Sequence, residues 1–98
     1  MIICVLLTYD VSNRHPEVKN EMKNLGYFES IKRKNETRGY TLPNTTLWKK
    51  SEELKTETVL LDLQNVIQKL NVGVALNNKI KLEKAIAVEF TNWSAIEN

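Results

Sequence analysis

The chain opens with Ile2-Ile3-Cys4-Val5-Leu6-Leu7-Thr8-Tyr9, and the fold can be worked out from this run. Its apolar residues follow one another without alternating with polar ones, many of them are β-branched, and polar residues follow. Strands that are covered on both faces have this pattern. The run therefore predicts a strand in the middle of a sheet.

A short amphipathic helix is expected next. Pro16 suits a first helical position, where its missing N–H costs nothing. Val18, Met22 and Leu25 share one stripe of such a helix, and Gly26 follows as a residue that can adopt a positive φ.

Two further strands are predicted over Tyr27–Arg33 and Tyr40–Trp48, joined by the polar connection 34–39 that is typical of a hairpin turn. Because proline cannot donate a ladder hydrogen bond, Pro43 predicts that the second of these strands is irregular there or lies at an edge. The segment 49–55 is polar.

The strongest helical pattern lies between residue 56 and residue 70, with either Thr56 or Thr58 as its cap. One face of this helix would carry Val59, Leu60, Leu63, Val66, Ile67 and Leu70. From Ile80 to Phe90 the even positions are apolar except for Lys84, which predicts a last strand with one apolar face.

The order strand, helix, strand, strand, helix, strand predicts an α+β domain of the ferredoxin-like βαββαβ type over residues 1–98. Both helices would lie on one face of an antiparallel sheet, with the first strand central because crossovers are right-handed. The other face would be left uncovered by the protomer's own helices. We therefore expect a homodimer.

Composition narrows the class of protein. With 98 residues, 42% hydrophobic and 27% charged, the chain resembles an average globular domain, and its net charge of +2 is too small to attract nucleic acid by bulk field. The single cysteine, Cys4, excludes an intrachain disulfide and is expected to be a small core residue. Neither a signal peptide nor a membrane span is predicted, so a cytoplasmic location is expected.

Three segments resemble the CRISPR-associated protein 2 family: the opening Leu7-Thr8-Tyr9-Asp10-Val11-Ser12, the helix exit Leu25-Gly26-Tyr27, and the strand Asn44-Thr45-Thr46-Leu47-Trp48. The resemblance implies a ferredoxin-like dimer that acts on nucleic acid. Members of this family include metal-dependent nucleases and non-catalytic subunits of the spacer-integration complex. Carried over, Asp10 matches the aspartate that binds the metal in the nucleases.

Asp10 is therefore the candidate catalytic residue and metal ligand. One carboxylate is insufficient for a catalytic Mg²⁺ unless a dimer axis pairs two of them. The alternative is that Asp10 accepts hydrogen bonds from the loop 11–14 as a turn residue. His15, beside Arg14, could meet a phosphate or act as a general acid or base, or it could be a surface residue at the helix start.

A local basic cluster is the candidate nucleic-acid site, and the alternative is a solvated hairpin whose charges protect a sheet edge. Tyr9, Trp48 and Trp93 could stack on bases or pack as core or interface aromatics. The cluster comprises Lys32, Arg33, Lys34, Arg38, Lys49 and Lys50.

Three functions remain open. We favour a nucleic-acid-binding or scaffolding dimer without catalysis. The alternatives are a Mg²⁺-dependent endonuclease that uses Asp10 of both protomers on RNA or DNA, and a protein-interaction module. A glycine-rich phosphate loop, a metal-spaced histidine pair and a nucleophile elbow are absent from the sequence.

Overall fold

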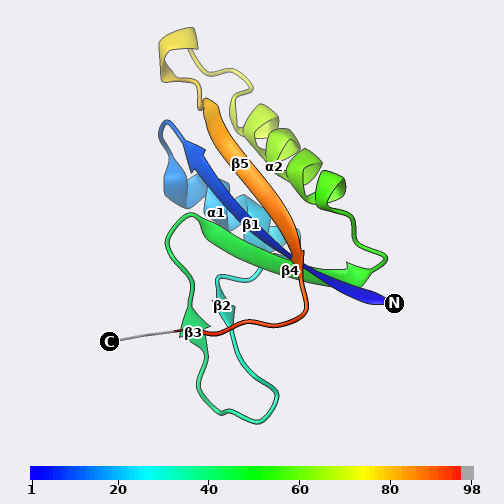
Figure 1. Ribbon diagram of the computed structural model, residues 1–98. Coiled ribbons are helices and arrows are strands. Elements are labelled where there is room, and N and C mark those ends of the chain that lie inside the picture. The colour runs from blue at the N-terminus through cyan, green and yellow to red at the C-terminus, as the bar shows by residue number, and fades with distance from the viewer. Residues whose placement is uncertain (96–98) are drawn as a thin grey trace.

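The computed structural model describes residues 1–95 and has a mixed α+β architecture, with two helices and a three-stranded antiparallel sheet (Figure 1). No helix among these residues is both long and apolar enough to cross a membrane. In chain order, the elements are β1 (Ile2–Val11), α1 (His15–Asn24), β2 (Ser30–Ile31), β3 (Tyr40–Thr41), β4 (Thr46–Glu52), α2 (Thr56–Leu70), the short 3-10 helix η1 (Leu76–Asn78) and β5 (Leu82–Phe90).

The first strand is central, as its continuous apolar run predicts. The sheet order is β4-β1-β5, and β1 is antiparallel to both neighbours. This arrangement, with both helices on one face, is compatible with the ferredoxin-like fold. The segment expected as the sheet's fourth strand pairs with β4 at a single isolated bridge within the described residues, between Phe28 and Trp48.

The two middle strands differ from the prediction. Residues 27–33 form only the two-residue strand β2, which pairs with β3 in a separate small sheet. The stretch 40–48 is divided into β3 and β4 by an irregular segment at Pro43, whose carbonyl accepts a hydrogen bond from the Thr46 amide at 2.9 Å. The expected irregularity at the proline is therefore confirmed. β4 continues to Glu52, through residues expected to be a polar connection.

The helix boundaries follow the sequence signals, with one correction. Pro16 lies in the first turn of α1, and Gly26 just beyond its end has a φ of +97°. Helix α2 begins at Thr56, but neither predicted threonine caps it. The Thr56 hydroxyl donates to the Glu57 carboxylate at 2.8 Å instead, and Thr58 lies inside the helix.

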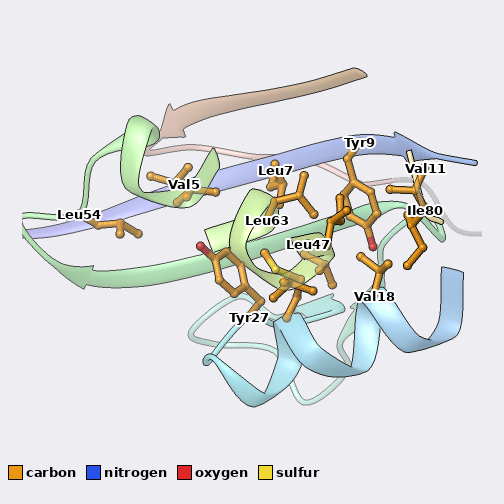
Figure 2. Packing of buried hydrophobic residues seen from close by; sticks show 14 residues of the cluster. Val5, Leu7, Tyr9, Val11, Val18, Tyr27, Leu47, Leu54, Leu63 and Ile80 are labelled. Atoms are coloured by element: carbon orange, nitrogen blue, oxygen red, sulfur yellow. The ribbon is translucent and has the colours of Figure 1, made fainter. Parts of the chain in front are cut away.

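The core lies between the sheet and the two helices (Figure 2). Odd-numbered side chains of β1 point into it, since successive residues of a strand face opposite sides. They meet Val18 and Met22 of α1 and the apolar stripe of α2. The side chains that are most completely buried are Val5, Leu7, Val18, Met22, Leu47, Val59 and Leu63.

A register shift in β5 explains why its apolar alternation is broken at Lys84. Asp10 is paired with Lys84, but the next residue, Val11, is paired with Leu82, so Glu83 is an extra residue. Leu82 therefore packs against the core, whereas Lys84 and the even positions after it face the other side of the sheet. The apolar even positions of this strand divide between both faces.

A polar contact joins the sheet to α2 beside this core. The Tyr27 hydroxyl donates to Asp62 Oδ2 at 2.8 Å, and Lys49 Nζ lies 4.0 Å from the same oxygen and 5.0 Å from the centre of the Tyr27 ring. Burial, together with the neighbouring Asp62 carboxylate, raises the pKa of Tyr27 well above its ordinary value. The hydroxyl is therefore a lasting hydrogen-bond donor to Asp62.

We expect Tyr27→Phe to lower the free energy of unfolding by about 1–2 kcal/mol, because it removes a hydrogen bond to a partly buried charged group. Chemical denaturation at neutral pH measures this change. Tyr40→Phe is the matched control, since the Tyr40 hydroxyl has no hydrogen-bond partner within residues 1–95. Equal losses in the two variants would contradict the assignment.

The same pair of variants tests the pH dependence. A tyrosine in the unfolded chain ionises near pH 10, whereas Tyr27 in the folded protein keeps its proton to higher pH. The stability due to this raised pKa is therefore complete below about pH 10 and is lost progressively above it. The decline should be less steep in Tyr27→Phe than in the parent protein.

Candidate nucleic-acid interface

The face of the sheet opposite the helices carries the even-numbered side chains of β1. Residues that are paired across antiparallel strands lie on the same face of a sheet. The strand register therefore shows which side chains lie side by side on this face. Leu6 lies between Trp48 and Val88, and the neighbouring row has Thr8 at its centre. The Thr46 hydroxyl donates to that of Thr8 at 3.3 Å. We call this surface the uncovered face.

Three aromatic side chains gather at one end of the uncovered face. Phe28 lies 5.0 Å from Trp48, centre to centre, and Phe90 lies 6.1 Å from Trp48 in an edge-on arrangement. Trp48 is held by its indole N–H, which donates to the Ser30 carbonyl at 2.7 Å. The cluster therefore has a fixed orientation while part of its surface stays exposed.

The positive charge around this aromatic cluster is offset by acidic side chains to a smaller extent than the net charge of the chain suggests. Lys50 is exposed, and its Nζ lies 6.0 Å from the centre of the Trp48 ring. The nearest acid along β4 on the same face, Glu52, forms an ion pair with the amino group of Met1. Lys50 has no acidic partner among the described residues, so its charge is available to a phosphate.

The β2–β3 segment, residues 30–41, projects beyond the three-stranded sheet (Figure 1). We call it the basic hairpin because it holds Lys32, Arg33, Lys34 and Arg38. Arg33 is partly engaged: its guanidinium lies 5.0 Å from the centre of the Trp93 ring and donates to the Trp93 carbonyl at 2.9 Å.

The acid that precedes the hairpin is neutralised from α1. Lys23 and Lys19 lie 2.8 Å and 3.1 Å from the Glu29 carboxylate, and they hold the pKa of Glu29 below its ordinary value. Glu29 therefore stays ionised and paired. Its charge does little to offset the cations of the basic hairpin.

The structure does not bring all six predicted basic residues together. Lys49 and Lys50 are neighbours in β4, so their side chains leave opposite faces of the sheet. Lys49 lies on the helix side with Tyr27 and Asp62, whereas Lys50 lies on the uncovered face. The sequence cluster thus separates into Lys50, the basic hairpin and an internally engaged Lys49.

Asp10 is exposed and lies on the uncovered face, opposite Lys84 in the β1–β5 ladder. A shallow cavity of about 270 Å³ lies beside it, lined also by Thr8, Tyr9, Ala85 and Ile86. Asp10 is still part of β1, and within residues 1–95 its carboxylate accepts no hydrogen bond from the loop that follows. The turn-residue alternative is therefore not what the structure has.

A single protomer does not assemble a metal site from these residues. Among residues 1–95, no group of three or more histidine, cysteine, aspartate or glutamate side chains is placed to hold a metal ion. His15 is exposed at the first position of α1. Mg²⁺ binding by Asp10 would therefore need a second carboxylate from another copy of the chain.

The other residues singled out from the sequence are Tyr9, Trp93 and Cys4. Tyr9 is buried in the core, and Trp93 packs edge-on against Tyr40 with ring centres 5.7 Å apart. Cys4, expected in the core, is only partly buried. As an even-numbered residue of β1, it belongs to the uncovered face.

Sequence reasoning missed two residues of the aromatic cluster, Phe28 and Phe90. The signal for Phe90 was present, because it ends the even apolar series of the last strand, but the series alone does not say which face it covers. Phe28 was obscured because the strand expected around it is reduced to one bridge. Pairing with Trp48 is what places it on the uncovered face.

Comparison with known proteins adds no relative to this picture: no protein-family model matches the chain, and neither a curated protein nor a solved structure matches it significantly. The geometry of the uncovered face is therefore the basis for assigning a function.

Proposed function

We propose that this chain is a self-pairing nucleic-acid-binding module, built on a ferredoxin-like fold, that has no catalytic activity of its own. The observation that carries the proposal is the uncovered face, where an aromatic cluster lies next to Lys50 and the basic hairpin. This combination binds nucleic acids without sequence preference, since cations contact phosphates and aromatic rings stack on bases.

A local patch is sufficient although the whole chain carries only +2. Each lysine or arginine that neutralises a phosphate releases condensed counterions, and this release depends on the contacts and not on the overall charge. Glu29, which precedes the basic hairpin, and Glu52, which follows Lys50, are paired with other cations, and Glu36 inside the hairpin is surrounded in sequence by its four cations. The local field therefore favours an anionic strand.

Self-pairing would use the β5 side of the uncovered face. β5 is an edge strand of the sheet, and Ile86 and Val88 expose 58% and 43% of their surface on it. Exposed apolar side chains on an unpaired edge favour contact with another strand. A twofold arrangement would cover them with the same residues of a second copy.

We expect Ile86→Glu to convert the dimer to a monomer, because it would place a charge in this apolar contact. Light scattering at micromolar concentration measures the mass. Leu61→Glu is the matched control, since Leu61 is similarly exposed, at 53%, but lies on α2. A parent protein that is already monomeric would contradict self-pairing.

The two neighbouring lysines of β4 provide a test of the binding face. We expect Lys50→Ala to weaken binding of a labelled single-stranded RNA or DNA, and to reduce the slope of log K against log salt by about 0.7. Lys49→Ala should leave that slope unchanged and lower the stability instead, because Lys49 faces Asp62. Fluorescence anisotropy over a salt series measures the binding. Equal effects of the two substitutions would contradict the assignment of the face.

A second candidate function, a Mg²⁺-dependent endonuclease, is supported by the position of Asp10. Its carboxylate is exposed on the uncovered face and shares a cavity with Ile86 of the proposed dimer contact. A twofold axis there could bring two such carboxylates to one ion, which would polarise a phosphate and orient water.

Labelled RNA and DNA incubated with Mg²⁺ separate these functions. We expect no cleavage by the parent protein, in agreement with a binding module. Cleavage that disappears both with EDTA and in Asp10→Asn would establish the nuclease instead. If neither strand is bound or cut, the protein-interaction module is the function that remains.

A further inference from the structure

A small cavity of about 200 Å³ lies where the uncovered face meets the basic hairpin and the segment that follows β5. Leu6 and Phe90 form its sheet side, and Ile31 of β2 and Leu42, which directly follows β3, contribute from the other side. Residues 92–95, including Trp93, complete the lining. We call it the aromatic pocket.

The walls of the aromatic pocket are held in place before any ligand arrives. Trp93 is positioned by the Arg33 guanidinium and by the edge of Tyr40. Phe90 packs against Trp48, which is itself fixed by its hydrogen bond to Ser30. A ligand would therefore meet preorganised rings and would lose little affinity to ordering them.

The size and lining indicate one flat, uncharged ring system. A dry cavity of about 150 Å³ accommodates benzene, so a cavity of about 200 Å³ has room for a single heterocycle but not for a whole nucleotide. None of the described lining residues is charged, and two, Asn92 and Ser94, are polar. Asn92 Oδ1 accepts from the Trp93 amide at 3.0 Å, which leaves the Asn92 amide nitrogen to donate.

The surrounding charge identifies what such a ring is attached to. Arg33 lies over Trp93, and Lys50 lies over Trp48, whose ring contacts Phe90. Lys32 and Lys34 flank Arg33 in the basic hairpin and are exposed. A ligand with an apolar flat group and anionic neighbours complements this arrangement. The bases of a single strand meet that description, whereas those of a duplex are stacked inside the helix.

We propose that the aromatic pocket takes one unstacked base of a single-stranded nucleic acid, while the adjoining phosphates lie along Arg33, Lys50 and the basic hairpin. This inference rests on the proposed function and deepens it, since it names the single strand as the substrate class. Stacking on a side chain contributes enough per base to be measured separately from phosphate binding.

The test compares two strands on the same protein: a short oligothymidylate, and a strand of equal length in which every base is replaced by an abasic sugar. Phosphate contacts are common to both. We expect the oligothymidylate to bind about tenfold more tightly and to quench tryptophan fluorescence. In Phe90→Leu, which removes one wall, and in Leu42→Phe, which fills the cavity, the ratio of the two affinities should approach one.

Phe28→Leu is the matched control, because Phe28 belongs to the same aromatic cluster and contacts Trp48 but does not line the pocket. It should keep the ratio. A change in the folded fraction of a variant affects both strands equally and cancels in the ratio.

The outcomes separate the two proposals. Salt-dependent binding of both strands with equal affinity would overturn the pocket and leave the proposed function standing. Binding of neither strand would overturn both. A ratio lost equally in Phe28→Leu and Phe90→Leu, but kept in Leu42→Phe, would show that bases stack on the exposed rings and would also overturn the pocket.

Discussion

Side-chain alternation along β1 determines both the core and the outer face of this fold. As the central strand, β1 sends its odd residues into the core beneath two helices and its even residues to the uncovered face. A shift by one residue would exchange the two sets and expose Leu7 while burying Asp10. The same register that packs the core therefore also presents Leu6, Thr8 and Asp10 to the outside.

Two local irregularities shape the uncovered face. The extra residue Glu83 lets β5 turn Leu82 inward and Phe90 outward within one strand. Pro43 interrupts the strand structure between β3 and β4, so the basic hairpin leaves the main sheet instead of extending it. Together these features bring Phe90, Trp93 and the hairpin to one end of the face, where the aromatic pocket lies.

Much of the fold could be predicted from patterns that act locally. The apolar run of β1, the stripe of α2 and the stop at Gly26 depend on neighbouring residues, and each appears in the structure as expected. The extents and pairing of the two middle strands could not be predicted, because they depend on which distant segments pair. The face on which the even-numbered residues of β5 lie depends on a register shift relative to β1. Such a shift cannot be recognised in the sequence of the strand itself.

The candidate site was predictable in part for the same reason. A basic cluster can be read from the sequence, but Lys49 and Lys50 belong to opposite faces because β4 extends farther than their polar surroundings suggest. Asp10 lies at an exposed position, as its place near the end of the first strand suggests. The aromatic cluster was missed because Phe28, Trp48 and Phe90 come from three separate segments and meet only in the folded chain.

Whether the uncovered face binds nucleic acid can be measured by following backbone amide chemical shifts by NMR during titration with a single-stranded oligonucleotide. We expect the largest changes at Leu6, Trp48 and Phe90 and along the basic hairpin. Changes concentrated on the outer surfaces of α1 and α2, with the uncovered face unaffected, would contradict this expectation.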